Sequence, residues 1–143
     1  MTGAGGFVGG QVVKQAISKW EVHGLSGKPA VGALANAHWH TGSITDNDFL
    51  TATITSVRPH AIIHCAAIAD IDYTERNQDE ARQINVGVTE TIARLCAQCG
   101  SRMVHCSTDT VFSGENGPYS ETDAVDAVNL YGQTKIEAEH TVQ

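Results

Sequence analysis

The sequence predicts an α/β fold built on a doubly wound parallel sheet, and two observations lead to that prediction. Short apolar runs typical of buried strands alternate along the chain with longer segments of helical periodicity, an order that favours parallel strands with helices on both faces. A glycine-rich turn from Gly3 to Gly10 opens the first helix, as happens at the ligand-binding end of such sheets. No internal repeat or domain boundary is visible, so we expect one domain over residues 1–143.

Each element of the first half follows from an apolar run or from a breaker. The helix after the glycine turn is expected to reach about Ser18. Arg58 and Pro59 separate a helical pattern from a compact apolar run, because proline does not continue a helix. The elements expected after the first helix are strands at Glu21–Ser26 and around His38–Thr41, a helix at Asp46–Val57 and a strand at Ala61–Ala67.

The second half continues the alternation. Apolar residues recur at helical spacing from Asp79 to Cys99, and Gly100 ends that pattern. Beyond it, the expected elements are a buried strand at Arg102–Ser107, a loop at Ser113–Val128 that is rich in Gly, Asp and Glu, and a final helix at Asn129–Val142.

Both ends of the chain depart from a complete fold of this class. A phosphate-binding glycine turn normally follows a buried strand, but only Met1 and Thr2 precede Gly3. The last helix has no strand after it. We therefore expect a fold that lacks its first, central strand and a C-terminal substrate region, and a fragment that is marginally stable and inactive by itself.

Composition excludes some classes of partner. The formal net charge is −7, which disfavours nucleic acid and anionic membranes because both require a basic surface. No apolar run approaches the roughly 20 residues that span a bilayer, and the N-terminus lacks the pattern of a signal peptide. The expected location is therefore cytoplasmic.

The cysteines and histidines predict no metal site. Cys65 and Cys106 lie in apolar runs, and the pair formed by Cys96 and Cys99 lies late in a helical pattern, without the strand and turn of a redox motif. No two of the seven histidines stand at i,i+4 spacing within a predicted helix. Zinc would need ligands that this spacing does not supply.

The glycine turn predicts a phosphate-binding site. Gly3, Gly6 and Gly9 fit a GxxGxxG pattern, in which the glycines allow a tight turn, a close approach to a pyrophosphate and close helix packing. The pyrophosphate would accept hydrogen bonds from backbone N–H groups at the helix N-terminus. The alternative is a glycine-rich loop without function.

The end of the second strand favours NADP over NAD. NAD-binding versions of this fold carry an acidic residue about 20 residues beyond the turn, where it binds the ribose 2′-hydroxyl. Here that region holds Ser26 and Lys28 and no acid, and both side chains suit a 2′-phosphate. The alternative is that Lys28 is a solvated loop charge, which leaves NAD open.

Two later segments supply catalytic candidates. Tyr131 and Lys135 form a YxxxK motif and share one helical face, where the ammonium would favour the phenolate and so aid proton transfer. Ser107 and Thr108 follow an apolar strand, at the edge where open α/β sheets bind ligands. Either hydroxyl can donate a hydrogen bond to a substrate carbonyl, although strand-end turn chemistry explains both residues equally simply.

Taken in order, these motifs resemble extended short-chain dehydrogenases/reductases, which have a Rossmann-type NAD(P)-binding fold. The segment from Ser107 to Gly114 resembles the STDxVFxG element of dTDP-4-dehydrorhamnose reductases, the RmlD-like family, and the segment from His64 to Glu75 resembles their NAAA…DxxE element. Tyr131 to Glu139 resembles YGxxKxxxE. The resemblance covers essentially the whole chain.

The resemblance implies a role for each matched residue. Tyr131 would donate a proton to the ketone oxygen, Lys135 would bind the nicotinamide ribose, and Thr108 would contact the reacting oxygen. Asp109 would touch the sugar, and Asn85 would support the site or serve as a buried polar residue. The remaining expected cofactor contacts are Gly6, Phe7 and Val8 at the pyrophosphate and Ala66, Ala67 and Ile68 along the cleft.

The chain departs from the family pattern at two positions. His64 replaces an asparagine, which changes the local hydrogen bonding. Ser43 and Ile44 stand where an aspartate and an apolar residue contact adenine, so Ile44 can pack on the ring but the carboxylate is missing.

The resemblance implies an NADP(H)-dependent reductase of a nucleotide-linked 4-keto-6-deoxy sugar and is compatible with a homodimer. One alternative is an NAD-dependent sugar-nucleotide epimerase or dehydratase, which regenerates its cofactor. Another is a binding protein like the regulatory subunit of methionine adenosyltransferase, which shares the fold and binds NADP and a partner enzyme.

Overall fold

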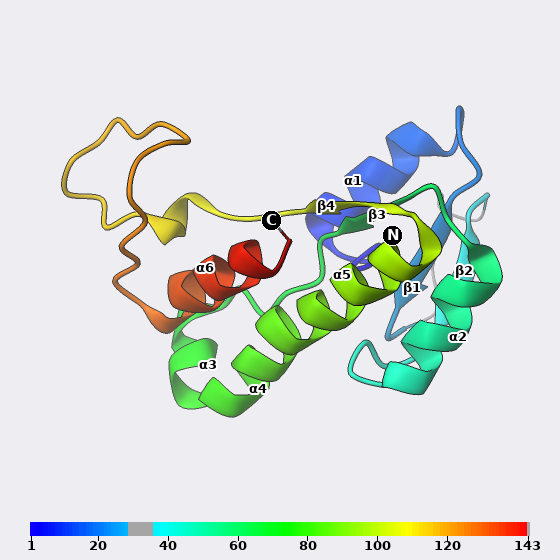
Figure 1. Cartoon of the computed structure of the whole chain (residues 1–143), viewed down its shortest axis with the longest axis horizontal. Coiled ribbons are helices and arrows are strands. Elements are labelled where there is room, and N and C mark those ends of the chain that lie inside the picture. Colours follow the sequence, from blue (N-terminus) through cyan, green and yellow to red (C-terminus); the bar gives the residue numbers. More distant parts are fainter. Residues whose placement is uncertain (29–35, 143) are drawn as a thin grey trace. The chain divides into compact units, whose positions relative to one another are not determined.

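The computed structural model describes residues 1–28 and 36–142, and the chain divides into two compact units (Figure 1). The first unit contains Met1–Ala66 and Thr91–Cys106, and the second contains Ala67–Glu90 and the residues from Ser107 on. All strands of the described residues lie in the first unit.

The strands are parallel, as the alternation of elements predicts. β1 (His23–Ser26) pairs with β2 (His38–Thr41), and β3 (Ala61–His64) pairs with β4 (Arg102–His105). Thr2 makes parallel bridges to a residue of β1 and to a residue of β3. The backbone order is therefore β2, β1, Thr2, β3, β4, which confirms the doubly wound arrangement, with Met1 and Thr2 in the position of the central strand.

Helices cover both faces of this sheet in the first unit. α1 (Phe7–Ala16) lies on one face, and α2 (Asn47–Val57) and the part of α5 (Val88–Cys99) from Thr91 on lie on the other (Figure 1). The core under α1 is small and apolar. It contains Ala4, Val13, Val22 and Ala37, with Met1, Ala16, Ile17 and Trp39 packed against it.

The second unit is made of helices and loops. It contains α3 (Ile71–Arg76), α4 (Gln78–Arg82), a π-helical turn at Gln83–Gly87, the first turn of α5, a 3₁₀ turn at Asp109–Val111 and α6 (Leu130–Val142). α6 packs against the π-helical turn, the 3₁₀ turn and α3. Within residues 1–28 and 36–142, no helix is long and apolar enough to cross a membrane.

Several element boundaries differ from the sequence prediction. The strand predicted at Ala61–Ala67 ends at His64, and the strand predicted at Arg102–Ser107 ends at His105. In both cases the chain leaves the sheet at its carboxyl edge and continues as a loop. The helix predicted from Asp79 to Cys99 contains a π-helical turn. α3 was not predicted, and its N-terminus is capped by Asp70, whose carboxylate accepts a hydrogen bond of 2.8 Å from the Tyr73 N–H.

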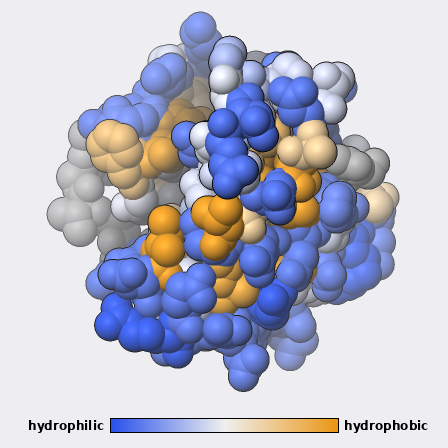
Figure 2. All heavy atoms as spheres, turned by 90° about the vertical axis from the view of Figure 1, so that its left-hand side faces the viewer, coloured by the Kyte–Doolittle hydropathy of each residue, from blue (hydrophilic) through white to orange (hydrophobic). Residues whose placement is uncertain are grey.

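The surface is mainly hydrophilic on the face drawn in Figure 2, where hydrophobic side chains form limited patches. Exposed large apolar residues include Trp20 and Val128, which are 73% and 72% exposed. A mainly hydrophilic surface is consistent with a chain of net charge −7.

Candidate functional site

The glycine turn lets three backbone segments of the first unit approach closely. Gly3 has a φ of +63°, and a Cβ there would lie 2.7 Å from the Ala66 nitrogen. A Cβ on Gly9 would lie 2.1 Å from the Gly3 carbonyl oxygen. Only glycine fits these two positions without a backbone shift. The lack of a side chain there allows the turn to pack closely against α1 and the segment after β3.

The N-terminus of α1 is suited to an anion. Its N-cap residue is Gly6, which has an extended backbone and no side chain to accept a hydrogen bond from the first turn. The Gly6 N–H itself donates to the Gly3 carbonyl at 2.9 Å. The free amides of the first helical turn and the helix dipole favour a phosphate group there.

A cleft of about 650 Å³ opens beside this turn, at the carboxyl ends of β1 and β2. Six residues that the sequence analysis assigned to cofactor binding line it: Gly3, Gly6, Ser26, Lys28, Ile44 and Ala66. Phe7 and Val8 do not line it and are 87% and 49% exposed on α1. All of the lining residues belong to the first unit.

The sequence analysis missed the aromatic residues of this cleft. Trp39 and Phe49 line it, and each packs where a glycine leaves room. A Cβ on Gly24 would lie 2.9 Å from the Trp39 ring, and a Cβ on Gly42 would lie 2.8 Å from the Phe49 ring. The other lining residues that were missed are Gly5, Leu25, Gly27 and Gly42. A glycine directly after a strand, as at position 42, was a signal that could have identified the aromatic side of the cleft.

The end of the cleft near β1 carries a positive charge. Lys28 is the only charged residue among the described residues that line the cleft, and residues 29–35, which lie outside the described part, carry no charged side chain. The Lys28 backbone N–H donates to the Ser26 hydroxyl at 3.3 Å. This pair offers an ammonium and a hydroxyl to an anionic group.

The position expected for adenine contains no carboxylate. Ser43 and Ile44 line the cleft, and the Ser43 hydroxyl hydrogen-bonds the Thr45 hydroxyl at 2.8 Å. The nearest acid in sequence, Asp46, caps α2 by accepting from the Asp48 and Phe49 N–H groups, each at 3.0 Å. The cleft therefore offers apolar contact here.

In the second unit, α6 presents the YxxxK motif. Tyr131 is half-buried, and Lys135 is 2% exposed. The start of the helix is held by two side-chain acceptors: Glu75 accepts from the Leu130 N–H at 2.8 Å, and Asn129 accepts from the Gly132 N–H at 2.8 Å.

Asn85 ties the loop after β3 to α6 within the second unit. Its side-chain oxygen accepts from the Ile68 N–H at 2.8 Å, and its amide donates to the Ile68 carbonyl and the Thr134 hydroxyl, each at 3.0 Å. The Thr134 hydroxyl in turn donates to the Tyr131 carbonyl at 2.7 Å. Asn85 is 1% exposed, so it is a buried polar residue that also supports the helix carrying the motif.

The turn that carries Thr108 packs directly on α6. The Thr108 hydroxyl accepts from the Thr110 N–H at 3.2 Å and so caps the 3₁₀ turn, while Asp109 is exposed. Ser107 donates a hydrogen bond to Glu139 on α6. A Cβ on Gly132 would lie 2.4 Å from the Thr110 carbonyl oxygen, so glycine inside YxxxK allows the close approach.

The candidate residues therefore form two groups, each within one unit. The first unit contains the cleft with its glycine turn, Ser26 and Lys28. The second unit contains Thr108, Asp109, Tyr131 and Lys135, together with the loop residues Ala67 and Ile68. His64 is buried in the first unit and hydrogen-bonds the Thr2 hydroxyl at 2.6 Å.

In a comparison with protein families, the model of the RmlD substrate binding domain matches residues 1–143. Methionine adenosyltransferase 2 subunit beta of Rattus norvegicus is 34% identical over 143 residues, which cover 99% of this chain and 41% of that protein. The dTDP-4-dehydrorhamnose reductase of Escherichia coli (strain K12) is 34% identical over 105 residues, which cover 73% of this chain and 35% of that protein. The chain thus spans less than half the length of these relatives.

Solved structures of related proteins match the fold of nearly the whole chain. A hypothetical dTDP-4-dehydrorhamnose reductase from Sulfolobus tokodaii matches with a TM-score of 0.91 and 31% identity, over 99% of this chain and 50% of that one. MoeE5 in complex with UDP-glucose and NAD matches with a TM-score of 0.84 and 26% identity, over 99% of this chain and 46% of that one.

Proposed function

The chain belongs to the RmlD substrate binding domain family, and from this membership we propose that it binds a nicotinamide dinucleotide, NADP(H) in preference to NAD(H), as part of a sugar-nucleotide reductase. The cleft of the first unit carries the proposal. Its glycine turn packs closely against neighbouring backbone where a Cβ would not fit. The N-terminus of α1 follows this turn, and the amides of its first turn suit a pyrophosphate. Lys28 and Ser26 suit the additional 2′-phosphate of NADP.

The proposed reaction is reduction of the C4 ketone of a dTDP-linked 4-keto-6-deoxy sugar. Bound NADPH supplies the hydride, which is the chemistry of that cofactor. The Tyr131 hydroxyl donates the proton to the ketone oxygen, and the Lys135 ammonium stabilises the phenolate that remains. The Thr108 hydroxyl orients the carbonyl by a hydrogen bond, and Asp109 contacts the sugar. We expect further sugar contacts from the portion of the relatives' length that this chain does not match.

The test is NADPH oxidation by the complete protein, with dTDP-4-keto-6-deoxy sugar as substrate. Tyr131→Phe is expected to lower turnover at least about 100-fold, the usual contribution of a positioned general acid, while leaving the Kd for NADPH within about twofold. Tyr73→Phe is the matched control, because the Tyr73 hydroxyl donates to Glu80 at 2.7 Å on the exposed side of α3. Undiminished ketone reduction by Tyr131→Phe would remove this residue from the proposed mechanism.

A second candidate is a non-catalytic NADP-binding subunit. One observation favours it: at the same 34% identity, the rat methionine adenosyltransferase beta subunit matches 99% of this chain, whereas the reductase of E. coli matches 73%. This candidate predicts that the complete protein binds NADPH and captures a methionine adenosyltransferase catalytic subunit, but does not oxidise NADPH with the keto sugar. An epimerase or dehydratase would instead convert a nucleotide sugar without net consumption of NADPH.

A further inference from the structure

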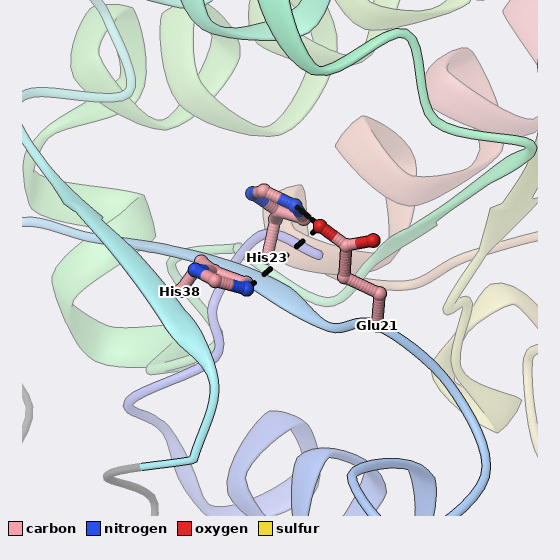
Figure 3. A group of neighbouring side chains, drawn as sticks. All are labelled: Glu21, His23 and His38. Carbon is pink, nitrogen blue, oxygen red and sulfur yellow. Dashed lines mark hydrogen bonds and ion pairs between the residues drawn. The ribbon is translucent and has the colours of Figure 1, made fainter.

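Three side chains of known metal-binding type converge on one face of the β1–β2 pair. His23 and His38 are direct partners in the register of these parallel strands, and Glu21 precedes His23 by one side-chain repeat. As register partners, His23 and His38 lie on the same face. Glu21, which lies outside β1, reaches them from the segment just before it. Figure 3 shows their polar ends pointing toward one another.

The distances are close to those of a metal site. Glu21 Oε1 lies 3.1 Å from His23 Nε2 and 3.8 Å from His38 Nε2, and the three ligand atoms lie within 4.8 Å of one another. Zinc bonds of about 2.0–2.1 Å in a tetrahedral site place ligand atoms roughly 3.3 Å apart. The side chains of Glu21 and His38 are 74% and 64% exposed, so both are free to make the small rotations that binding requires.

We propose that Glu21, His23 and His38 form a binding site for a divalent transition-metal ion, with zinc as the best match. Two imidazole nitrogens and a carboxylate oxygen suit the borderline character of Zn²⁺, and water would fill the fourth position. The sequence analysis expected no metal because it searched for helical spacing, whereas this set depends on the pairing of two strands.

His40 completes the arrangement as a positioning residue. Its Nε2 lies 3.0 Å from His23 Nδ1. When a metal ion replaces the proton that His23 Nε2 directs at Glu21, a proton on His23 Nδ1 can be donated to His40. A hydrogen bond donated by the second ring nitrogen usually orients a metal-binding histidine.

The site is separate from the proposed dinucleotide cleft. Its residues lie before or at the first positions of β1 and β2, while the cleft lies at the opposite ends of the same strands, at Ser26 and Gly42. A bound ion would connect the two strands and stabilise their pairing. Metal binding and dinucleotide binding can therefore be tested independently.

The experiment is calorimetric titration of Zn²⁺ into the full chain, prepared without a polyhistidine tag. One zinc ion per chain is expected to bind, and Glu21→Gln and His38→Ala are each expected to raise the Kd at least about tenfold. His60→Ala is the control, because His60 is an exposed histidine of the same unit outside the cluster, and it should leave the Kd unchanged. Zinc should also raise the midpoint of thermal unfolding in the parent and in His60→Ala, but not in His38→Ala.

Absence of saturable zinc binding would overturn the proposal, as would equal affinity in the parent, Glu21→Gln and His38→Ala. Far-ultraviolet circular dichroism establishes that each variant is folded before its affinity is compared. Because Glu21 is exposed and glutamine has nearly the same shape, Glu21→Gln separates loss of the ligand from loss of the fold.

Discussion

Gly9 and Gly10 are neighbours in α1 but differ in the space around them. A Cβ on Gly9 would lie 2.1 Å from the Gly3 carbonyl oxygen, whereas a Cβ on Gly10 would lie 3.6 Å from the Ala4 carbonyl oxygen, an ordinary contact. Gly9→Ala is therefore expected to lower the free energy of unfolding by about 1–3 kcal/mol through overpacking. Gly10→Ala should raise it by up to about 1 kcal/mol, because alanine favours a helix. Urea unfolding of the two variants measures the difference, and equal stabilities would contradict the close packing of the turn.

Lys28 is the charged residue on which the proposed preference for NADP depends. Lys28→Ala is expected to raise the Kd for NADPH about tenfold, the loss of roughly 1.4 kcal/mol from one exposed charge-assisted contact, with little change for NADH. Lys19→Ala is the matched control, because Lys19 is an exposed lysine that does not line the cleft. Fluorescence titration measures the Kd for each cofactor. An equal loss of affinity for NADPH and NADH would show that Lys28 does not contact the 2′-phosphate.

At the scale of elements, the π-helical turn and α6 depend on Asn85. Asn85→Ala removes three hydrogen bonds and leaves the partly buried Ile68 N–H and carbonyl without their partner. We expect the free energy of unfolding to fall by about 2–4 kcal/mol. Gln83→Ala, at an exposed position of the same turn, should change it by less than about 0.5 kcal/mol. The measurement is chemical denaturation. A similar loss of unfolding free energy in both variants would mean that the hydrogen bonds of Asn85 contribute little to stability.

The elements that could be predicted from the sequence are those with a local signal. The strand at His38–Thr41 and the end of α2 at Val57 have the predicted bounds. The breaker formed by Arg58 and Pro59 marks the end of α2. α3 has six residues and no apolar period of its own; the short capping signal at Asp70 was the only local sign of it. The π-helical turn could not be predicted, because its location depends on tertiary bonds made by Asn85.

The candidate site divides in the same way. Glycine spacing and strand ends identify the floor of the cleft, because close backbone approach demands glycine wherever the fold brings chains together. Trp39 and Phe49 were missed because their role depends on tertiary contacts, with Gly24 of the neighbouring strand for Trp39 and with Gly42 after β2 for Phe49. The histidine cluster was missed for a related reason: it exists only once β1 and β2 are paired in register.

At the scale of the whole molecule, the two units carry different parts of the proposed chemistry, and a ligand cut in half can separate their contributions. Adenosine 2′,5′-bisphosphate carries the adenine and 2′-phosphate of NADPH without the nicotinamide. In hydrogen-exchange measurements on the complete protein, we expect both ligands to slow exchange in the glycine turn and at Ser26–Lys28. Only NADPH should slow exchange in residues 107–111 and 130–136, which carry Thr108, Tyr131 and Lys135.

The reason is that a ligand protects the amides whose opening it opposes. Protection of the first unit alone by NADPH would leave the dinucleotide cleft intact but would remove Tyr131 and Lys135 from cofactor binding, the result expected of a subunit that binds NADP without reducing a ketone. No protection by either ligand would overturn the cleft itself. The two failures are distinct, so one comparison decides between a reductase, a binding subunit and neither.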